Sequence, residues 1–133
     1  FLFSPSITKT FKNEINAIAT AQKIQSMIAN HNRMFRQKLN VGISLNYGTI
    51  IGKQEPDSFK FMSMGTLVTM GKKLASQSNG EILISDKLKE VLPPNVKIEK
   101  QSSDNMSYYK LHEVKDAEDH QKFIKRFLES NKD

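Results

Sequence analysis

Residues 48–53 read Gly-Thr-Ile-Ile-Gly-Lys and are the part of the chain most similar to a phosphate-binding loop. A Walker-type loop needs four residues between its glycines and a Ser or Thr after the lysine, so that backbone N–H groups surround the phosphate. Here three residues separate Gly48 from Gly52, and Gln54 follows Lys53. The loop has the wrong size for this chemistry, and we reject a Walker site.

The side chains that could bind a metal or act as a nucleophile are few. The histidines are His31, His112 and His120, and the last two are eight residues apart, whereas paired ligands on one helical face are three or four apart. This spacing predicts three separate histidines on three elements. The chain has no cysteine, which excludes disulfides and thiolate metal sites. No serine lies in a Gly-x-Ser-x-Gly motif.

The chain is basic, with 20 Lys and Arg against 14 Asp and Glu. An excess of positive charge suits a nucleotide, a nucleic acid or an acidic partner, but it is also typical of a lysine-rich surface. Tyr108 and Tyr109 next to Lys110 could stack on single-stranded nucleic acid. Because neighbouring strand residues face opposite ways, we expect one of these tyrosines in the core. No nucleic-acid-binding motif accompanies them.

The elements that must position these residues follow from hydrophobic periodicity. Apolar residues at spacings of three and four predict a long helix that begins near Thr10 or Asn13, either of which could cap it, and ends near Leu39. Strict alternation over residues 41–46 then predicts a strand, a second short apolar run follows at 49–51, and residues 55–58 predict a turn before another strand at 59–64. The apolar face of the long helix is predicted to consist of Ala17, Ala21, Ile24, Ile28 and Phe35.

The second half of the chain predicts a helix, a buried strand and a hairpin. The helix should start with Thr66 as N-cap and end at Asn79-Gly80. A strand at 81–85 should lead through a Ser85 cap into a small helix that ends at Val91, before Pro93-Pro94. Strands are expected near 96–100 and 106–114. A terminal amphipathic helix is expected from about Ala117, with Phe123, Ile124, Phe127 and Leu128 on its apolar face.

This order predicts one α+β domain over residues 1–133, with a mixed or antiparallel sheet and helices on one face. Its composition, 38% hydrophobic and 26% charged, is that of a folded soluble protein. No apolar run approaches the roughly 18 residues of a membrane span, and no signal peptide opens the chain. We therefore expect a cytoplasmic location. Since the chain opens on Phe1-Leu2-Phe3 rather than Met, we expect a fragment of a longer protein.

Four segments between residues 41 and 85 follow one another in a fixed order and spacing. Residues 42–52 fit the pattern G-I-x-x-x-x-G-x-V-x-G with Ile50 in place of the valine, and Phe61 supplies an aromatic residue on the next strand. Residues 65–74 align without a gap with G-D-x-V-N-x-A-x-R-L, and residues 80–85 fit G-x-I-x-x-S. Together these segments resemble the C-terminal half of the class III adenylate and guanylate cyclase domain, which implies a ferredoxin-like fold.

The resemblance implies roles for four residues that should share a cleft. Gly65 and Thr66 fall where the family binds nucleotide, and Thr66 stands where an Asp often contacts the base. Thr69 replaces the family's ribose-positioning Asn, and Lys73 replaces the Arg that stabilises the transferring phosphate. Lysine keeps the charge but loses the bidentate guanidinium fork. The family's two metal-binding aspartates belong to the half that this chain does not match.

These substitutions imply a catalytically degenerate cyclase homology domain that acts in signalling through dimerisation or regulation. The expected partner is a second copy, an N-terminal segment or a second cyclase domain, because the matched half alone should expose a sheet edge. One alternative is an active half of a composite cyclase that converts ATP or GTP to the cyclic nucleotide with Mg²⁺ or Mn²⁺ held by a partner. Another is a basic module that binds nucleic acid or an acidic partner. No cofactor is expected for the chain alone.

Overall fold

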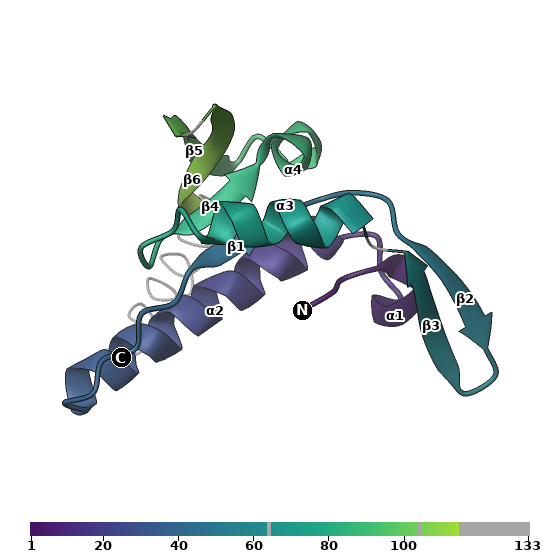
Figure 1. The fold of residues 1–133 in the computed structure, drawn as a ribbon, viewed down its shortest axis with the longest axis horizontal. Helices are drawn as coiled ribbons and strands as arrows, with labels where there is room; N and C mark the ends of the chain where they lie inside the picture. The colour runs from purple at the N-terminus through teal and green to yellow at the C-terminus, as the bar shows by residue number, and fades with distance from the viewer. Residues whose placement is uncertain (64, 104, 115–133) are drawn as a thin grey trace, which may run out of the picture.

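The computed structural model describes residues 1–63, 65–103 and 105–114, which fold into four helices and six strands (Figure 1). The terminal helix expected from about Ala117 lies outside the described residues, as does His120. None of the described helices combines the length and apolarity that a membrane crossing requires. The elements are α1 Pro5–Thr8, α2 Asn13–Met34, β1 Ile43–Leu45, β2 Ile51–Glu55, β3 Ser58–Ser63, α3 Gly65–Ala75, β4 Ile82–Ser85, α4 Asp86–Val91, β5 Val96–Ser103 and β6 Met106–Val114.

The strands form two separate sheets. One has four strands in the order β1-β4-β6-β5, in which β1 and β4 are parallel and the other neighbours are antiparallel. The other is the two-stranded β2–β3 hairpin, which projects from the body of the molecule (Figure 1). Its turn is at Pro56-Asp57, inside the segment predicted from the sequence. The α+β class and the mixed sheet are therefore confirmed.

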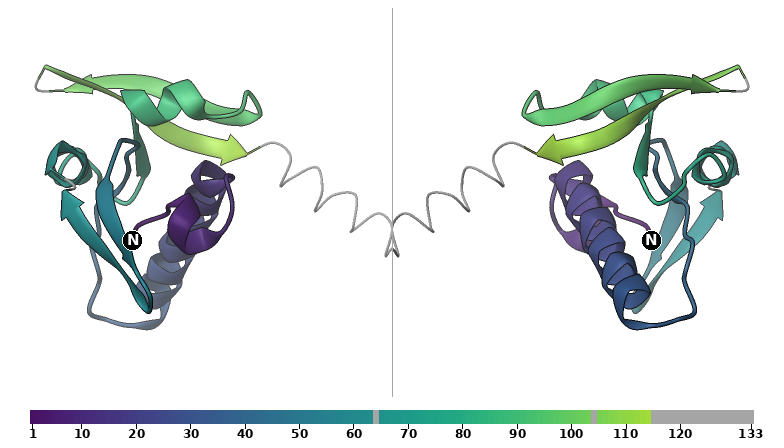
Figure 2. Two further views of the ribbon diagram at one scale, coloured as in Figure 1. Left: turned by 90° about the vertical axis from the view of Figure 1, so that its right-hand side faces the viewer. Right: turned by 90° about the vertical axis from the view of Figure 1, so that its left-hand side faces the viewer.

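Both faces of the four-stranded sheet are covered, so the prediction of helices on one face was wrong. Ile82 and Ile84 of β4 pack with residues of α2 and α4, whereas Leu83 between them packs with Leu74 of α3. Figure 2 shows α2 and α3 on opposite sides of the sheet. The physical reason lies in β4, where three consecutive apolar side chains point alternately to both faces and each face needs a cover.

The long helix α2 is confirmed, but its limits and its buried face differ from the prediction. It ends at Met34 rather than near Leu39, and the residue at its N-cap position is Lys12, without a side-chain cap. The Asn13 amide instead donates to the Thr10 carbonyl at 2.9 Å, so this side chain stabilises the preceding turn. Ile18 and Ala21 are the buried residues of α2. Ile18 was not in the predicted stripe, and Phe35 at the end of that stripe is exposed.

The helix α3 is also confirmed with corrected ends. It starts at Gly65, so Thr66 lies inside the first turn and is not the N-cap. It ends at Ala75, where a backbone turn from Ser78 N–H to the Ala75 carbonyl closes it. Gly80 has a φ of +91° but lies in the loop before β4, so it does not terminate the helix. The predicted cap of α4 is confirmed, since Leu88 N–H donates to Ser85 Oγ at 3.2 Å.

Strand β1 and helix α3 approach each other closely at Gly42. A Cβ atom at this position would overlap the carbonyl oxygen of Ala75 at the end of α3. A Cβ on Gly71, which lies inside α3, would only reach ordinary contact distance of Ser44 Oγ, at 3.9 Å. The two glycines therefore differ in physical role, although both lie at the same helix–strand contact.

We predict that Gly42→Ala lowers the free energy of unfolding by about 1–3 kcal/mol, because the backbone of α3 must move away from β1. Gly71→Ala is the matched control and should raise it by about 0.5–1 kcal/mol, because a glycine inside a helix costs backbone entropy. Urea denaturation followed by circular dichroism measures both. Equal effects of the two substitutions would contradict the close approach at Gly42.

Candidate functional site

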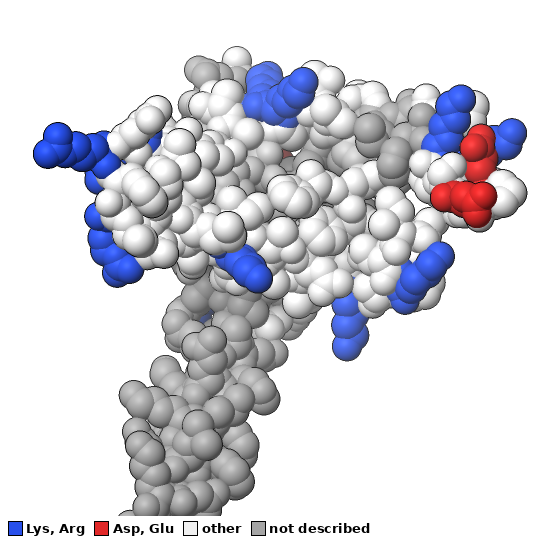
Figure 3. All heavy atoms as spheres, turned by 90° about the horizontal axis from the view of Figure 1, so that it is seen from below, with Lys and Arg blue, Asp and Glu red and all other residues white. Residues whose placement is uncertain are grey.

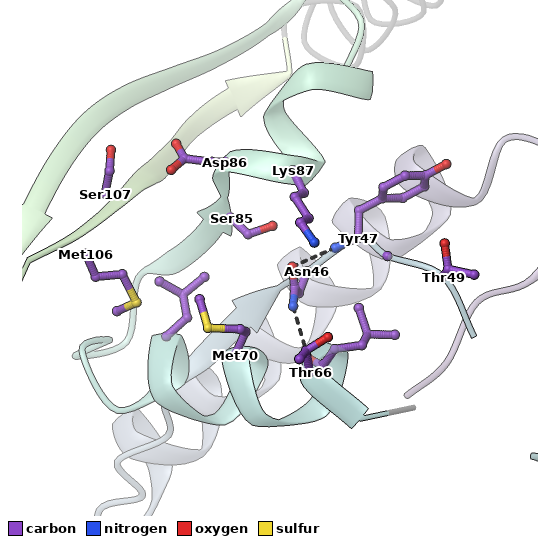
Figure 4. Close-up of a pocket in the computed structure, with 13 residues that line it drawn as sticks. Asn46, Tyr47, Thr49, Thr66, Met70, Ser85, Asp86, Lys87, Met106 and Ser107 are labelled. Atoms are coloured by element: carbon purple, nitrogen blue, oxygen red, sulfur yellow. Dashed lines mark hydrogen bonds between the residues drawn. The ribbon is translucent and has the colours of Figure 1, made fainter. Parts of the chain in front are cut away.

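A cleft of about 370 Å³ lies where the parallel strands β1 and β4 end (Figure 4). Its walls are the loop after β1, the inner side of α3, the junction of β4 with α4, and the start of β6. Leu67, Met70, Leu74 and Met106 supply apolar surface, and most of the remaining lining residues are polar. The polar and charged lining residues are Asn46, Tyr47, Thr49, Thr66, Ser85, Asp86, Lys87 and Ser107.

Hydrogen bonds from β1 and from Asn46, the residue after it, fix the position of the α3 wall. Ser44 Oγ donates to the Gly71 carbonyl at 2.7 Å, and Asn46 Nδ2 donates to the Leu67 carbonyl at 2.9 Å. These two carbonyls are four residues apart and therefore lie one above the other on the same side of the helix. Because side chains alternate along an extended chain, the polar ones here point toward α3, while Ile43 and Leu45 pack on the α2 side of the sheet.

Asn46 also directs the loop that forms the opposite rim of the cleft. Its Oδ1 atom accepts a hydrogen bond from Tyr47 N–H at 2.9 Å, so one side chain holds both the loop and the helix. At Gly48 a Cβ atom would come within 3.1 Å of Leu67 Cδ1. The absence of a side chain there lets the loop pass close to α3, which narrows the cleft.

The junction of β4 and α4 supplies the charged side of the cleft. Of the residues that line it, only Asp86 and Lys87 carry a full charge at neutral pH. Figure 4 shows the Lys87 side chain pointing toward Asn46 and Tyr47. Ser85 Oγ is occupied as the helix cap, so this hydroxyl has a structural partner. The cleft has an apolar wall, a few hydrogen-bonding groups and one charge of each sign, which is the composition of a small-molecule site.

The structure brings one of the four predicted site residues to the cleft. Thr66 lines it, whereas Gly65, Thr69 and Lys73 do not. Thr69 Oγ1 donates to the Gly65 carbonyl at 3.3 Å along the helix, and Lys73 is exposed on the neighbouring side of α3. Within the described residues, Thr69 and Lys73 therefore lie outside the cleft that Thr66 lines.

The two described histidines, His31 and His112, have local structural partners. His31 at the end of α2 stacks on Phe35, with ring centroids 4.7 Å apart. His112 on β6 has its Nε2 atom 2.7 Å from Glu99 Oε2 of β5. These two histidines lie on different elements, as predicted. Among the described residues no three acidic or histidine side chains converge as metal ligands.

One tyrosine was predicted to be in the core, and this is confirmed. Tyr108 is buried against α3 together with Leu83 and Met106. Tyr109 is half-buried on the opposite face, and Lys89 Nζ lies 5.6 Å from its ring centroid. Because Tyr108 is buried, the two tyrosines do not offer a pair of exposed rings for stacking.

The sequence did not single out Lys87 or Met106 as site residues, because neither belongs to a motif and no periodic pattern links them to α3. Asn46 could have been recognised as a site residue, since it follows Gly42 and Ser44 on the polar side of an alternating strand.

Comparison of the chain with models of protein families, with curated proteins and with solved structures finds no match.

We predict that Asn46→Ala lowers the free energy of unfolding by about 1–3 kcal/mol, because it removes one partly buried and one exposed hydrogen bond, each worth about 0.5–1.5 kcal/mol. Gln54→Ala is the control, since the Gln54 amide donates to the Glu55 and Ser58 carbonyls on the exposed hairpin. Chemical denaturation of both variants measures the difference. An Asn46→Ala protein as stable as Gln54→Ala would show that Asn46 does not hold α3.

Proposed function

We propose that the chain is a cytoplasmic, catalytically degenerate nucleotidyl cyclase homology domain that acts in signalling by association. The supporting observation is the placement of the four cyclase-like segments. They fall in order on β1 with its loop, on β3, on α3 and on β4. Two of them, the loop after β1 and the start of α3, both line the cleft, which supports the proposal.

The proposed loss of catalysis rests on α3. Thr69 and Lys73 stand at the positions of the ribose-binding Asn and the phosphate-stabilising Arg, and neither lines the cleft of the single chain. Preorganised donors of this kind contribute about 2–4 kcal/mol each to lowering a barrier, and they act only when held at the reacting atoms. An exposed lysine on a flexible stem does not supply that positioning.

The proposed association rests on unpaired surface next to the cleft. Within the described part of the chain, β1 is an edge strand of its sheet, and the β2–β3 hairpin forms a sheet of two strands only. An isolated two-stranded hairpin is marginally stable in water. Exposed apolar side chains lie on the loop after β1, the hairpin and α3, the elements that a second copy would cover. They are Tyr47, Ile51, Met62, Val68 and Met70.

We predict that the chain dimerises at micromolar concentration and that Val68→Asp weakens the dimer at least tenfold, because a carboxylate would be buried in the interface. Val91→Asp is the matched control. Both valines are 41% exposed, but Val91 lies at the end of α4, away from the hairpin. Sedimentation velocity over a concentration series measures both. A wild-type protein that stays monomeric throughout the series would contradict the proposal.

We predict no cyclic nucleotide product when the chain is incubated with ATP or GTP and Mn²⁺, and no change on Lys73→Ala. Mass spectrometry of the nucleotide pool measures the product. The composite-cyclase alternative predicts the opposite result when the longer protein or a partner domain is present, namely product that disappears on Lys73→Ala. Product with that dependence would establish catalysis and overturn the degenerate interpretation.

A further inference from the structure

The C-terminal end of α2 and the residues after it form a rigid projection, which we call the α2 tip and define as residues 33–39. It lies at the extreme end of the molecule, opposite the hairpin (Figure 1). The Asn32 side chain bonds both backbone groups of Leu39. Leu39 N–H donates to Asn32 Oδ1 at 2.7 Å, and Asn32 Nδ2 donates to the Leu39 carbonyl at 2.9 Å. Lys38 Nζ donates to the Phe35 carbonyl at 3.0 Å and also to that of Asn32.

Large apolar side chains are exposed on this rigid tip. Met34 is 67% exposed, Phe35 is 53% exposed and Leu39 is 41% exposed. The Phe35 ring is oriented by its stacking on His31. Hydrogen bonds fix the backbone beneath these side chains, so little backbone entropy remains to be lost when they bind.

The tip is also basic, with Arg33, Arg36 and Lys38 among its seven residues. No Asp or Glu occurs between Glu14 and Glu55 in the sequence, so the cations have no acidic neighbour along α2 or the following segment. Figure 3 shows basic side chains at the end where α2 terminates, while the prominent acidic ones lie at the opposite end, over the hairpin. Arg33 donates one N–H to Asn30 Oδ1 at 2.6 Å, out of the five that a guanidinium offers.

We propose that the α2 tip binds the surface of an anionic phospholipid bilayer. Met34 and Phe35 enter the boundary between headgroups and acyl chains, and Arg33 and Arg36 contact lipid phosphates. A bilayer accepts a projecting apolar apex surrounded by cations, whereas peptide recognition uses a groove or a sheet edge on the receiving protein. Binding strength rises with the apolar area buried in the bilayer and with electrostatic attraction to anionic lipids, and the tip offers both. The inference does not depend on the cyclase-like function.

Flotation with phosphatidylcholine vesicles that contain phosphatidylserine tests the electrostatic part. The full chain should float with these vesicles, should not float with pure phosphatidylcholine, and should dissociate as salt is raised. The double substitution Arg33→Gln and Arg36→Gln should weaken binding by roughly fivefold for each cation removed. Lys9→Gln with Lys12→Gln removes the same charge from the exposed segment before α2 and should leave binding at the wild-type value. Equal losses in both double variants would overturn the proposal, because they would indicate attraction by net charge.

The apolar part is tested by Met34→Ser with Phe35→Ser, which should reduce vesicle binding at least tenfold. Ile7→Ser with Phe11→Ser is the matched control, because both side chains are exposed, at 46% and 87%, and lie before the start of α2, at the other end of that helix. Circular dichroism of each variant verifies that it is folded. Vesicle binding that survives the Met34 and Phe35 substitutions would overturn the proposal. So would displacement of the vesicles by soluble polyglutamate at the same concentration of negative charge, which would indicate an acidic protein partner instead.

Discussion

The contact between β1 and α3 is the interaction on which the rest of the described structure depends. Backbone approach at Gly42 and hydrogen bonds from Ser44 and Asn46 place the helix on one side of the sheet. A side-chain donor that satisfies a helix carbonyl fixes both distance and rotation, which apolar packing alone does not. Because α3 follows the hairpin directly and forms a wall of the cleft, this contact sets the position of both.

The four-stranded sheet separates two small cores instead of covering one. The larger core joins α2 and α4 to β4 through Ile82 and Ile84, and the smaller one joins α3 to Leu83 and Tyr108. A helix that buries few residues gains less hydrophobic stabilisation than one in a large core, so polar contacts determine more of its position. This explains why the cleft lies beside α3, where apolar filling is incomplete and Met70 remains partly exposed.

Periodicity predicted nearly every element, because alternation at 41–46 and spacing of three and four along α2 report local geometry directly. Periodicity failed where a contact between elements distant in sequence determines which side chains are buried. The burial of Ile18 depends on which side of α2 meets the sheet, and β4 needs cover on both faces. The motif positions predicted Thr66 at the cleft but not Lys87 or Met106, since two elements distant in sequence bring them there. The cyclase-like function stays a prediction.

The parallel pairing of β1 with β4 also constrains the order in which the chain assembles. Residue 43 pairs with residue 82, and the hairpin and α3 lie between them. The hairpin and the helix are local structures that form in microseconds. Pairing of β1 with β4 must close a long loop, and the entropy of closing it is lost before the contacts between the strands form. Docking of α3 onto Ser44 and Asn46 shortens that loop, so the same polar side chains that support the cleft lower the entropic barrier to completing the sheet.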